Sequence, residues 1–216
     1  IEKLNALQVS DAVKYFSGVT VKDYGGIGGL KTVSVRSLGA AYTAVSYDGI
    51  TLTDCQTGQI DVGRFSLDNV DMLSLNNGQS DNIFQPARMF ASASLLNIRT
   101  LSPKFINNKT LNGKASLKGG SFGLLNPSFL LQQKISPKYA ASLSGEWLSA
   151  HGEYPYLLHH SYLGDGTTSN ETRKNSDVQN FRIEGALHAN FSENESGYLK
   201  AYFYNSERGL PGGTIL

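Results

Sequence analysis

The sequence predicts two kinds of structure in one chain: an α+β domain over residues 1–105, then antiparallel strands of a transmembrane β-barrel over residues 106–216. Two observations predict this. The first part combines one helical pattern with short β-rich runs and glycine-containing turns, whereas the second part alternates apolar and polar residues with a period of two. About five strands are too few to close a spanning barrel, so we expect this chain to be part of a longer protein.

In the first part, apolar residues at helical spacing predict a short helix over residues 7–16, which Ser17-Gly18 would end. Asp48-Gly49 is typical of a hairpin turn between two strands. A helical turn is expected over residues 65–70. The short β-rich runs predict strands over residues 19–21, 32–36, 43–47, 50–52, 72–75 and 95–100.

Composition excludes several classes of function. Nineteen basic and 18 acidic residues give a net charge of +1, so no nucleic-acid partner is indicated. The single cysteine, Cys55, excludes an internal disulfide framework. The common hydrolase and metalloprotease motifs are absent, so we expect no catalytic residue and no enzyme. Neighbouring residues on a strand point to opposite sides, so His159 and His160 do not indicate a metal site, and no cofactor is expected.

In the second part, odd-numbered positions are mainly apolar and even-numbered positions are polar or charged. The runs cover residues 111–119, 129–135, 138–149, 178–191 and 197–203. Several runs reach the about 9–11 residues that span a bilayer when tilted. Phe181 and Phe191 lie ten residues apart, roughly 33 Å along a strand and about 25 Å once tilted, the height of the apolar band of an outer-membrane barrel.

The connections also favour a barrel over the half-buried sheet of a soluble protein, which alternates in the same way. Residues 136–137 and 192–195 form short turns, whereas residues 151–176 form one long polar loop. Outer-membrane barrels have short turns on one side of the membrane and long loops on the other.

Four motifs follow one another in the first part: Phe-Ser-Gly-Val, Val-Ser-Val-Arg-Ser, Tyr-Asp-Gly and Leu-Leu-Asn-Ile-Arg-Thr. Taken in this order, they resemble the plug domain of TonB-dependent outer-membrane receptors. The residues that match the family signatures in type and order are Gly18-Val19, Arg36, Asp48-Gly49, Gly78 and Asn97-Ile98. The chain departs from the family pattern at Ser17, Ser37, Ser74, Asn77 and Ala93-Ser94.

The resemblance implies an outer-membrane receptor that takes up a large, scarce nutrient. An iron–siderophore complex or cobalamin is favoured over a glycan. The implied partners are the nutrient ligand, outer-membrane lipid and the TonB energy-coupling protein, which would act on a segment preceding Ile1. The alternative is a soluble or surface-exposed β-rich adhesion or ligand-binding module without transport.

By resemblance, ligand contacts are expected on the plug loops 24–30 and 53–60, and also on 82–88. The polar candidates for ligand contact are Tyr24, Asp54, Gln56 and Gln59, and the aromatic candidates in the long external loop are Tyr154, Tyr156 and Tyr162.

Contacts between plug and barrel are expected to be polar, because the plug has to be held and still move. Arg36 and Arg99 lie on plug strands, and Glu146 and Glu184 lie at inward-facing barrel positions. We expect Arg36 to pair with one or both glutamates. The open alternative is that Arg36 ends a surface strand while the glutamates are solvated.

Overall fold

The computed structural model of the chain describes residues 6–78, 85–160, 167–192 and 195–211. The chain forms two compact units: residues 1–24 with 29–104, and residues 25–28 with 105–216. Compactness does not show independent folding, so the domain boundary at residue 105 stays a prediction. No helix in the described ranges is long and apolar enough to cross a membrane.

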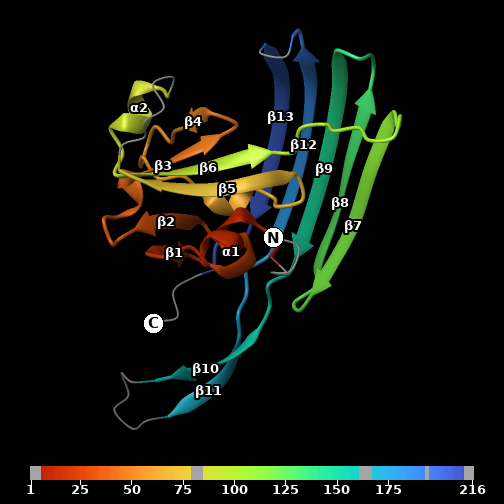
Figure 1. Ribbon diagram of the computed structural model, residues 1–216. Coiled ribbons are helices and arrows are strands. Elements are labelled where there is room, and N and C mark those ends of the chain that lie inside the picture. Colours follow the sequence, from red (N-terminus) through yellow and green to blue (C-terminus); the bar gives the residue numbers. More distant parts are fainter. Residues whose placement is uncertain (1–5, 79–84, 161–166, 193–194, 212–216) are drawn as a thin grey trace. The chain divides into compact units, whose positions relative to one another are not determined.

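The first unit is an α+β structure (Figure 1), as the sequence predicts. β3 pairs with β6 in parallel within a four-stranded sheet of order β4-β3-β6-β5, and β1 and β2 form a separate antiparallel pair. Its elements are α1 (Val9–Val13), β1 (Val19–Asp23), β2 (Lys31–Val35), η3 (Ala40–Tyr42), β3 (Thr43–Tyr47), β4 (Ile50–Leu52), η4 (Val62–Arg64), β5 (Val70–Asn77), α2 (Ala87–Phe90) and β6 (Ser94–Thr100).

Two helical predictions for this unit were wrong in extent or place. α1 is shorter than the expected 7–16. Before it, Leu7 accepts the N–H of Leu67, and after it, Tyr15 and Phe16 donate to carbonyls three residues back instead of four. The helical turn expected over 65–70 lies at Val62–Arg64, where the Asp61 carboxylate accepts the N–H of Gly63. α2, which follows Pro86, was not predicted.

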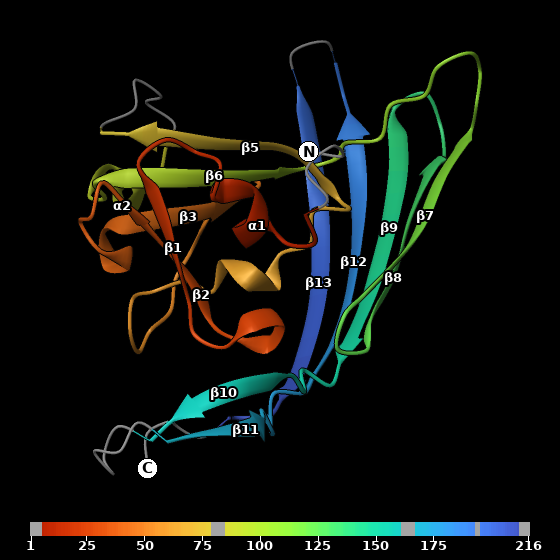
Figure 2. The same cartoon turned by 90° about the horizontal axis from the view of Figure 1, so that it is seen from below.

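Apolar side chains from α1, η4 and the strands form the core of the first unit. The buried cluster contains Val9, Ala12, Val13, Val33, Val35, Val45, Ile60, Val62, Phe65, Leu67, Val70, Leu96 and Ile98. α1 contributes Val9, Ala12 and Val13 from one side, which is the helical spacing seen in the sequence. Figure 2 shows α1 and the β1–β2 pair.

Asp48 fastens the β3–β4 turn to the end of β6. Asp48 and Gly49 both have positive φ, 48° and 83°, the conformation that a two-residue hairpin turn needs. The Asp48 carboxylate accepts the N–H of Thr100 at 2.7 Å and its hydroxyl at 2.8 Å. The Asp-Gly pair therefore determines both the turn and the position of the neighbouring strand.

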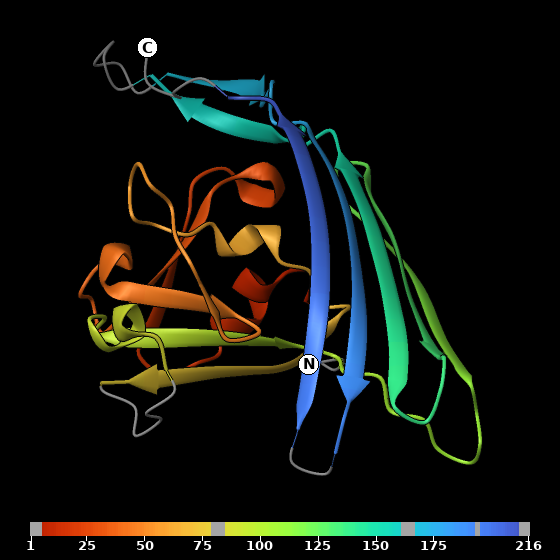
Figure 3. The same ribbon diagram turned by 90° about the horizontal axis from the view of Figure 1, so that it is seen from above.

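The second unit is built on one antiparallel sheet of order β13-β12-β9-β8-β7. The five strands are 10 to 13 residues long, enough to span a bilayer when tilted. Figure 3 shows that they bend in the same direction, so that the sheet is curved. The elements are η2 (Gly26–Gly28), β7 (Leu111–Gly120), β8 (Leu124–Lys134), β9 (Tyr139–Ala150), β10 (Pro155–His159), β11 (Thr168–Thr172), β12 (Val178–Asn190) and β13 (Ser196–Arg208).

The predicted alternation places large apolar side chains on one face of this sheet. Large exposed apolar side chains at odd positions are Leu117, Leu125, Phe129, Leu131, Leu143, Phe181, Ile183, Leu187, Leu199 and Phe203. Glu207, near the end of β13, is the only charged residue at an odd position of these five strands. Such a face is suited to lipid, where a charge at mid-depth costs about 2–4 kcal/mol.

The segment after β9 is more ordered than the long polar loop that the sequence predicts. It contains the antiparallel hairpin β10–β11, which extends beyond the ends of β9 and β12 (Figures 1 and 2). The His160 ring is hydrogen-bonded to the Ser169 hydroxyl at 3.0 Å, and Ser169 donates to Glu171 at 2.9 Å. The contact of His160 with Ser169 links the two sides of the hairpin, and the contact of Ser169 with Glu171 lies along β11.

The Asp48 contact makes a testable prediction. Asp48→Ala removes both acceptors of Thr100 and places alanine at positive φ. We therefore expect the free energy of local opening at Thr100 to fall by about 2 kcal/mol. Hydrogen exchange at the Thr100 amide should become about thirtyfold faster. Asp48→Asn is the control, because asparagine tolerates positive φ and keeps one acceptor oxygen. Unchanged exchange in Asp48→Ala would show that the contact does not hold β6.

Candidate functional site

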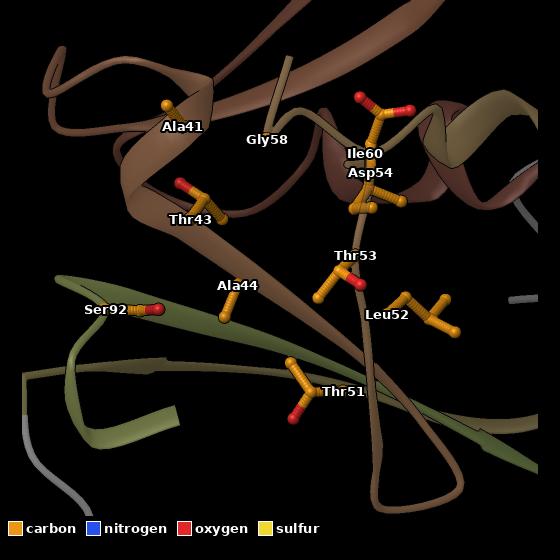
Figure 4. A pocket seen from close by; sticks show the side chains of 10 residues that line it. All are labelled: Ala41, Thr43, Ala44, Thr51, Leu52, Thr53, Asp54, Gly58, Ile60 and Ser92. Carbon is orange, nitrogen blue, oxygen red and sulfur yellow. The ribbon is translucent and has the colours of Figure 1, made fainter. Parts of the chain in front are cut away.

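A pocket of about 190 Å³ lies within the first unit, at one end of the strands of the four-stranded sheet (Figure 4). β3 and β6 are parallel, so both begin at this end, and β4 ends there because it runs antiparallel to β3. The loop that follows β4 closes the pocket. The lining residues are Ala41, Thr43, Ala44, Thr51, Leu52, Thr53, Asp54, Gly58, Ile60 and Ser92.

The pocket is lined by small side chains, several of which carry hydroxyl groups. Thr43 shares a hydrogen bond with Ser94 at 3.2 Å. The buried Thr51 hydroxyl has no hydrogen-bond partner among the described residues. Among the described residues that line the pocket, Asp54 alone is charged. Drug-sized ligands occupy pockets of roughly 300–1,000 Å³, so this pocket is smaller than one that holds a whole ligand of that size.

Asp54, a predicted ligand residue, organises the loop beside the pocket. One carboxylate oxygen accepts the N–H of Gln56 at 3.1 Å, and the N–H and hydroxyl of Thr57 at 2.6 and 2.8 Å. These hydrogen bonds, with that from the Thr57 N–H the strongest, lower the pKa of Asp54 below its ordinary 3.8. The carboxylate is therefore charged at neutral pH, and one of its oxygens is used within the loop.

The other predicted plug residues are spread more widely. Gln56 and Gln59 belong to the same loop as Asp54, and Thr57 accepts the N–H of Gln59 at 3.2 Å. Tyr24 follows β1 and is exposed, and it does not line the pocket. Residues 82–84 of the third expected loop lie outside the described residues. Ligand contact by Tyr24, Asp54, Gln56 and Gln59 stays a prediction.

The second unit contains a row of three aromatic rings. Tyr154 lies 5.7 Å from Phe122 and 6.4 Å from Tyr156, measured between ring centroids. The backbone joins the same segments, because His151 donates its N–H to the Phe122 carbonyl at 3.0 Å. The structure thus brings Tyr154 and Tyr156 together, while Tyr162 lies outside the described residues.

Sequence reasoning missed Phe122. This residue lies in the three-residue connection between β7 and β8 and has a φ of 61°. The signal was an aromatic residue next to glycine between two alternating runs, in a turn that leads to the same end of the sheet as the long loop.

The two barrel glutamates have partners within their own sheet. Glu146 accepts from the Asn126 amide at 2.9 Å and lies 4.0 Å from the Arg182 guanidinium. Glu184 is paired with Lys200 at 3.0 Å. These pairs join neighbouring strands β8, β9, β12 and β13 on the inward-facing side of the alternation.

The two plug arginines are found in different settings. Arg99 donates from Nε and Nη2 to one carboxylate oxygen of Asp71, at 3.2 and 2.8 Å. Arg36 lies in the turn after β2 with a φ of 50°. Contact between these arginines and the barrel glutamates stays a prediction. Among the described residues, no cluster of three or more His, Cys, Asp or Glu side chains is arranged to hold a metal.

Comparisons with known proteins agree with this architecture. Residues 1–90 match the family model of the TonB-dependent receptor plug domain. The copper transporter OprC has a TM-score of 0.70 and 17% identity over 94% of this chain and 29% of its own. The FrpB iron transporter of Neisseria meningitidis has a TM-score of 0.65 and 14% identity, over 90% of this chain and 28% of its own.

A third match, the pyoverdine receptor FpvA of Pseudomonas aeruginosa, has a TM-score of 0.64 and 12% identity, over 94% of this chain and 26% of its own. The chain thus spans less than a third of the length of these three structures. The fold is an α+β unit followed by a unit built on five antiparallel strands. Residues 1–90 therefore match the TonB-dependent receptor plug domain, and the chain as a whole shares its fold with these three structures.

The Asp54 loop makes a prediction that depends on pH. The pKa of Asp54 is lowered in the folded state, so the carboxylate stabilises the loop above pH 3.8, and this is lost as pH falls through the lowered value. A spin label on Cys55, the single and exposed cysteine, should therefore become mobile with a midpoint below pH 3.8.

Asp54→Asn is the control for this titration, because its side chain cannot be protonated in the same range. If the label on Cys55 became mobile at the same pH in Asp54→Asn, a titrating group other than Asp54 would control the order of the loop. A label that is equally mobile at neutral pH in wild type and in Asp54→Ala would show that Asp54 does not order the loop.

Proposed function

We propose that this chain belongs to a receptor that binds a large nutrient outside the cell and imports it with energy from TonB. The proposed ligand is a metal chelate, with a ferric siderophore favoured. The observation that carries the proposal is the plug-domain match, together with a pocket beside the loop predicted to contact ligand.

The comparisons support a metal or metal-chelate ligand over cobalamin. The matched structures are described as a copper transporter, an iron transporter and a receptor bound to pyoverdine. The row of Phe122, Tyr154 and Tyr156 offers faces on which planar groups of a chelate can pack. The 190 Å³ pocket would receive one polar group, since it is too small for a whole chelate.

The alternative of a soluble adhesion module is less well supported. A soluble sheet has its large apolar side chains covered, whereas Leu117, Leu199 and Phe203 are more than half exposed on one face. A role as receptor and transporter requires no catalytic step, and we propose none.

The experiment is a ligand screen by stabilisation of the full-length receptor in detergent. The panel contains ferric siderophores, cupric ion, haem, cobalamin and oligosaccharides. A ligand at one hundred times its dissociation constant should stabilise the native state by about 2.7 kcal/mol. We expect a ferric siderophore to do so. If only cobalamin or an oligosaccharide stabilised the receptor, the proposed ligand class would be wrong. If the receptor were stable without detergent and bound no ligand of the panel, the proposed transport function would be wrong.

The contribution of the pocket is tested by filling it. Ala44→Leu adds three carbon atoms to the pocket lining, and we expect the affinity for the identified ligand to fall about tenfold or more. Ala91→Leu is the matched control, because Ala91 is exposed and outside the lining. Equal affinity in both variants would place the ligand away from this pocket.

A further inference from the structure

A lysine is buried at the first position of β2. The side chain of Lys31 donates from Nζ to Oε1 of Gln8 at 2.9 Å, and the two residues are 5% and 6% exposed. Within the part of the chain that the structure describes, Gln8 is the only hydrogen-bond acceptor of this ammonium. A buried charge that loses its partner is strongly destabilised. Burial of Lys31 therefore depends on Gln8.

Gln8 belongs to the segment just before α1, and hydrogen bonds attach this segment to the residues that follow η4. Val9 donates its N–H to Phe65 at 2.9 Å, and Leu67 donates to Leu7 at 3.4 Å. The Asp11 carboxylate accepts the N–H groups of Leu7 and Gln8, each at 3.2 Å. The segment is thus held by a few hydrogen bonds just before α1.

The backbone of Lys31 is tied to the base of a second loop. Its N–H donates to an oxygen of Asp61 at 3.1 Å, and Gly63 donates to the same oxygen at 2.9 Å. Lys31 follows the connection after β1, and Asp61 follows the loop that Asp54 organises. One small group of residues therefore connects the bases of both loops with the segment before α1.

Gly63 lies close to both members of this pair. A Cβ atom on Gly63 would lie 3.1 Å from Cδ of Lys31 and 3.4 Å from Oε1 of Gln8. Because Lys31 is 5% exposed, its side chain is enclosed as long as the segment is docked. Displacement of Gln8 removes both the acceptor and one wall of this enclosure.

We propose that Lys31 couples docking of the segment before α1 to closure of the two loop bases. With Gln8 in place, the ammonium is held inside, and the β2 and Asp61 backbones keep their positions. When Gln8 is withdrawn, Lys31 moves to water, and its hydrogen bond to Asp61 opens with it. The proposal rests on the proposed function in one respect, because that function supplies the energy-coupling partner that would withdraw the segment.

The first test measures the reactivity of Lys31 in the full-length receptor. The receptor in detergent is treated briefly with acetic anhydride at neutral pH, and each lysine is quantified by mass spectrometry. Lys14, which is exposed and pairs with Asp11, is the internal reference. In wild type, Lys31 should react at least about tenfold more slowly than Lys14. Gln8→Met should remove most of this protection without changing Lys14.

The second test uses apolar substitution to keep the fold intact. Gln8→Met with Lys31→Met replaces the polar pair by two apolar side chains of similar length, which core packing tolerates. Exchange of the Lys31 and Gly63 amides should be fast in Gln8→Met and slow again in the double variant. Lys14→Met is the control for loss of a lysine charge.

Either of two results would overturn the proposal. One is fast acetylation of Lys31 in wild type, since the lysine would then not be enclosed. The other is Gln8→Met with Lys31 still protected and the Gly63 amide unchanged, since docking and loop closure would then be independent. Neither result bears on ligand binding in the screen described above, so failure of the coupling and failure of the transport function are distinguished.

Discussion

Hydrogen bonding of the backbone in lipid is the constraint on which the second unit depends. Water is absent from the membrane interior, so each N–H and C=O group there needs a partner within the protein. The sheet β13-β12-β9-β8-β7 meets this need along each internal strand, with continuous antiparallel register from Val178 to Asn190 between β12 and β13. The same geometry sends successive side chains to opposite faces, so one face is apolar and the other carries Glu146, Arg182, Glu184 and Lys200.

This constraint explains why the sequence predicted the barrel strands well. A period of two that persists over ten or more residues can be read along the chain without knowledge of tertiary contacts. The hairpin turn at Asp48-Gly49 was equally readable, because few residues accept positive φ. The prediction was poorer for α1, α2 and β10–β11. These are short elements held by tertiary hydrogen bonds, such as those from Leu67 to Leu7 and between His160 and Ser169, which no local pattern contains.

The site was predicted in part for the same reason. Position along the family motifs led to the loop with Asp54, and the structure places Asp54 at a pocket. The hydroxyl lining of that pocket combines Thr43, Thr51 and Thr53 with Ser92, which precedes β6 and reaches the pocket through the parallel pairing of β3 with β6. Phe122 joins Tyr154 and Tyr156 from a different connection, and Lys31 is buried against a residue 23 positions away. Sequence spacing does not show such pairs.

The measurement that tests the central claim most directly is the environment of two neighbouring residues on β12. Leu187 faces outward and His188 faces the opposite side. Each is replaced by a spin-labelled cysteine in a Cys55→Ser background of the full-length receptor in outer-membrane vesicles. Membrane-dissolved oxygen should relax the label at Leu187 more than a water-soluble nickel chelate does, and the label at His188 should show the reverse preference. Equal access of the nickel chelate at both positions would contradict a membrane-spanning sheet.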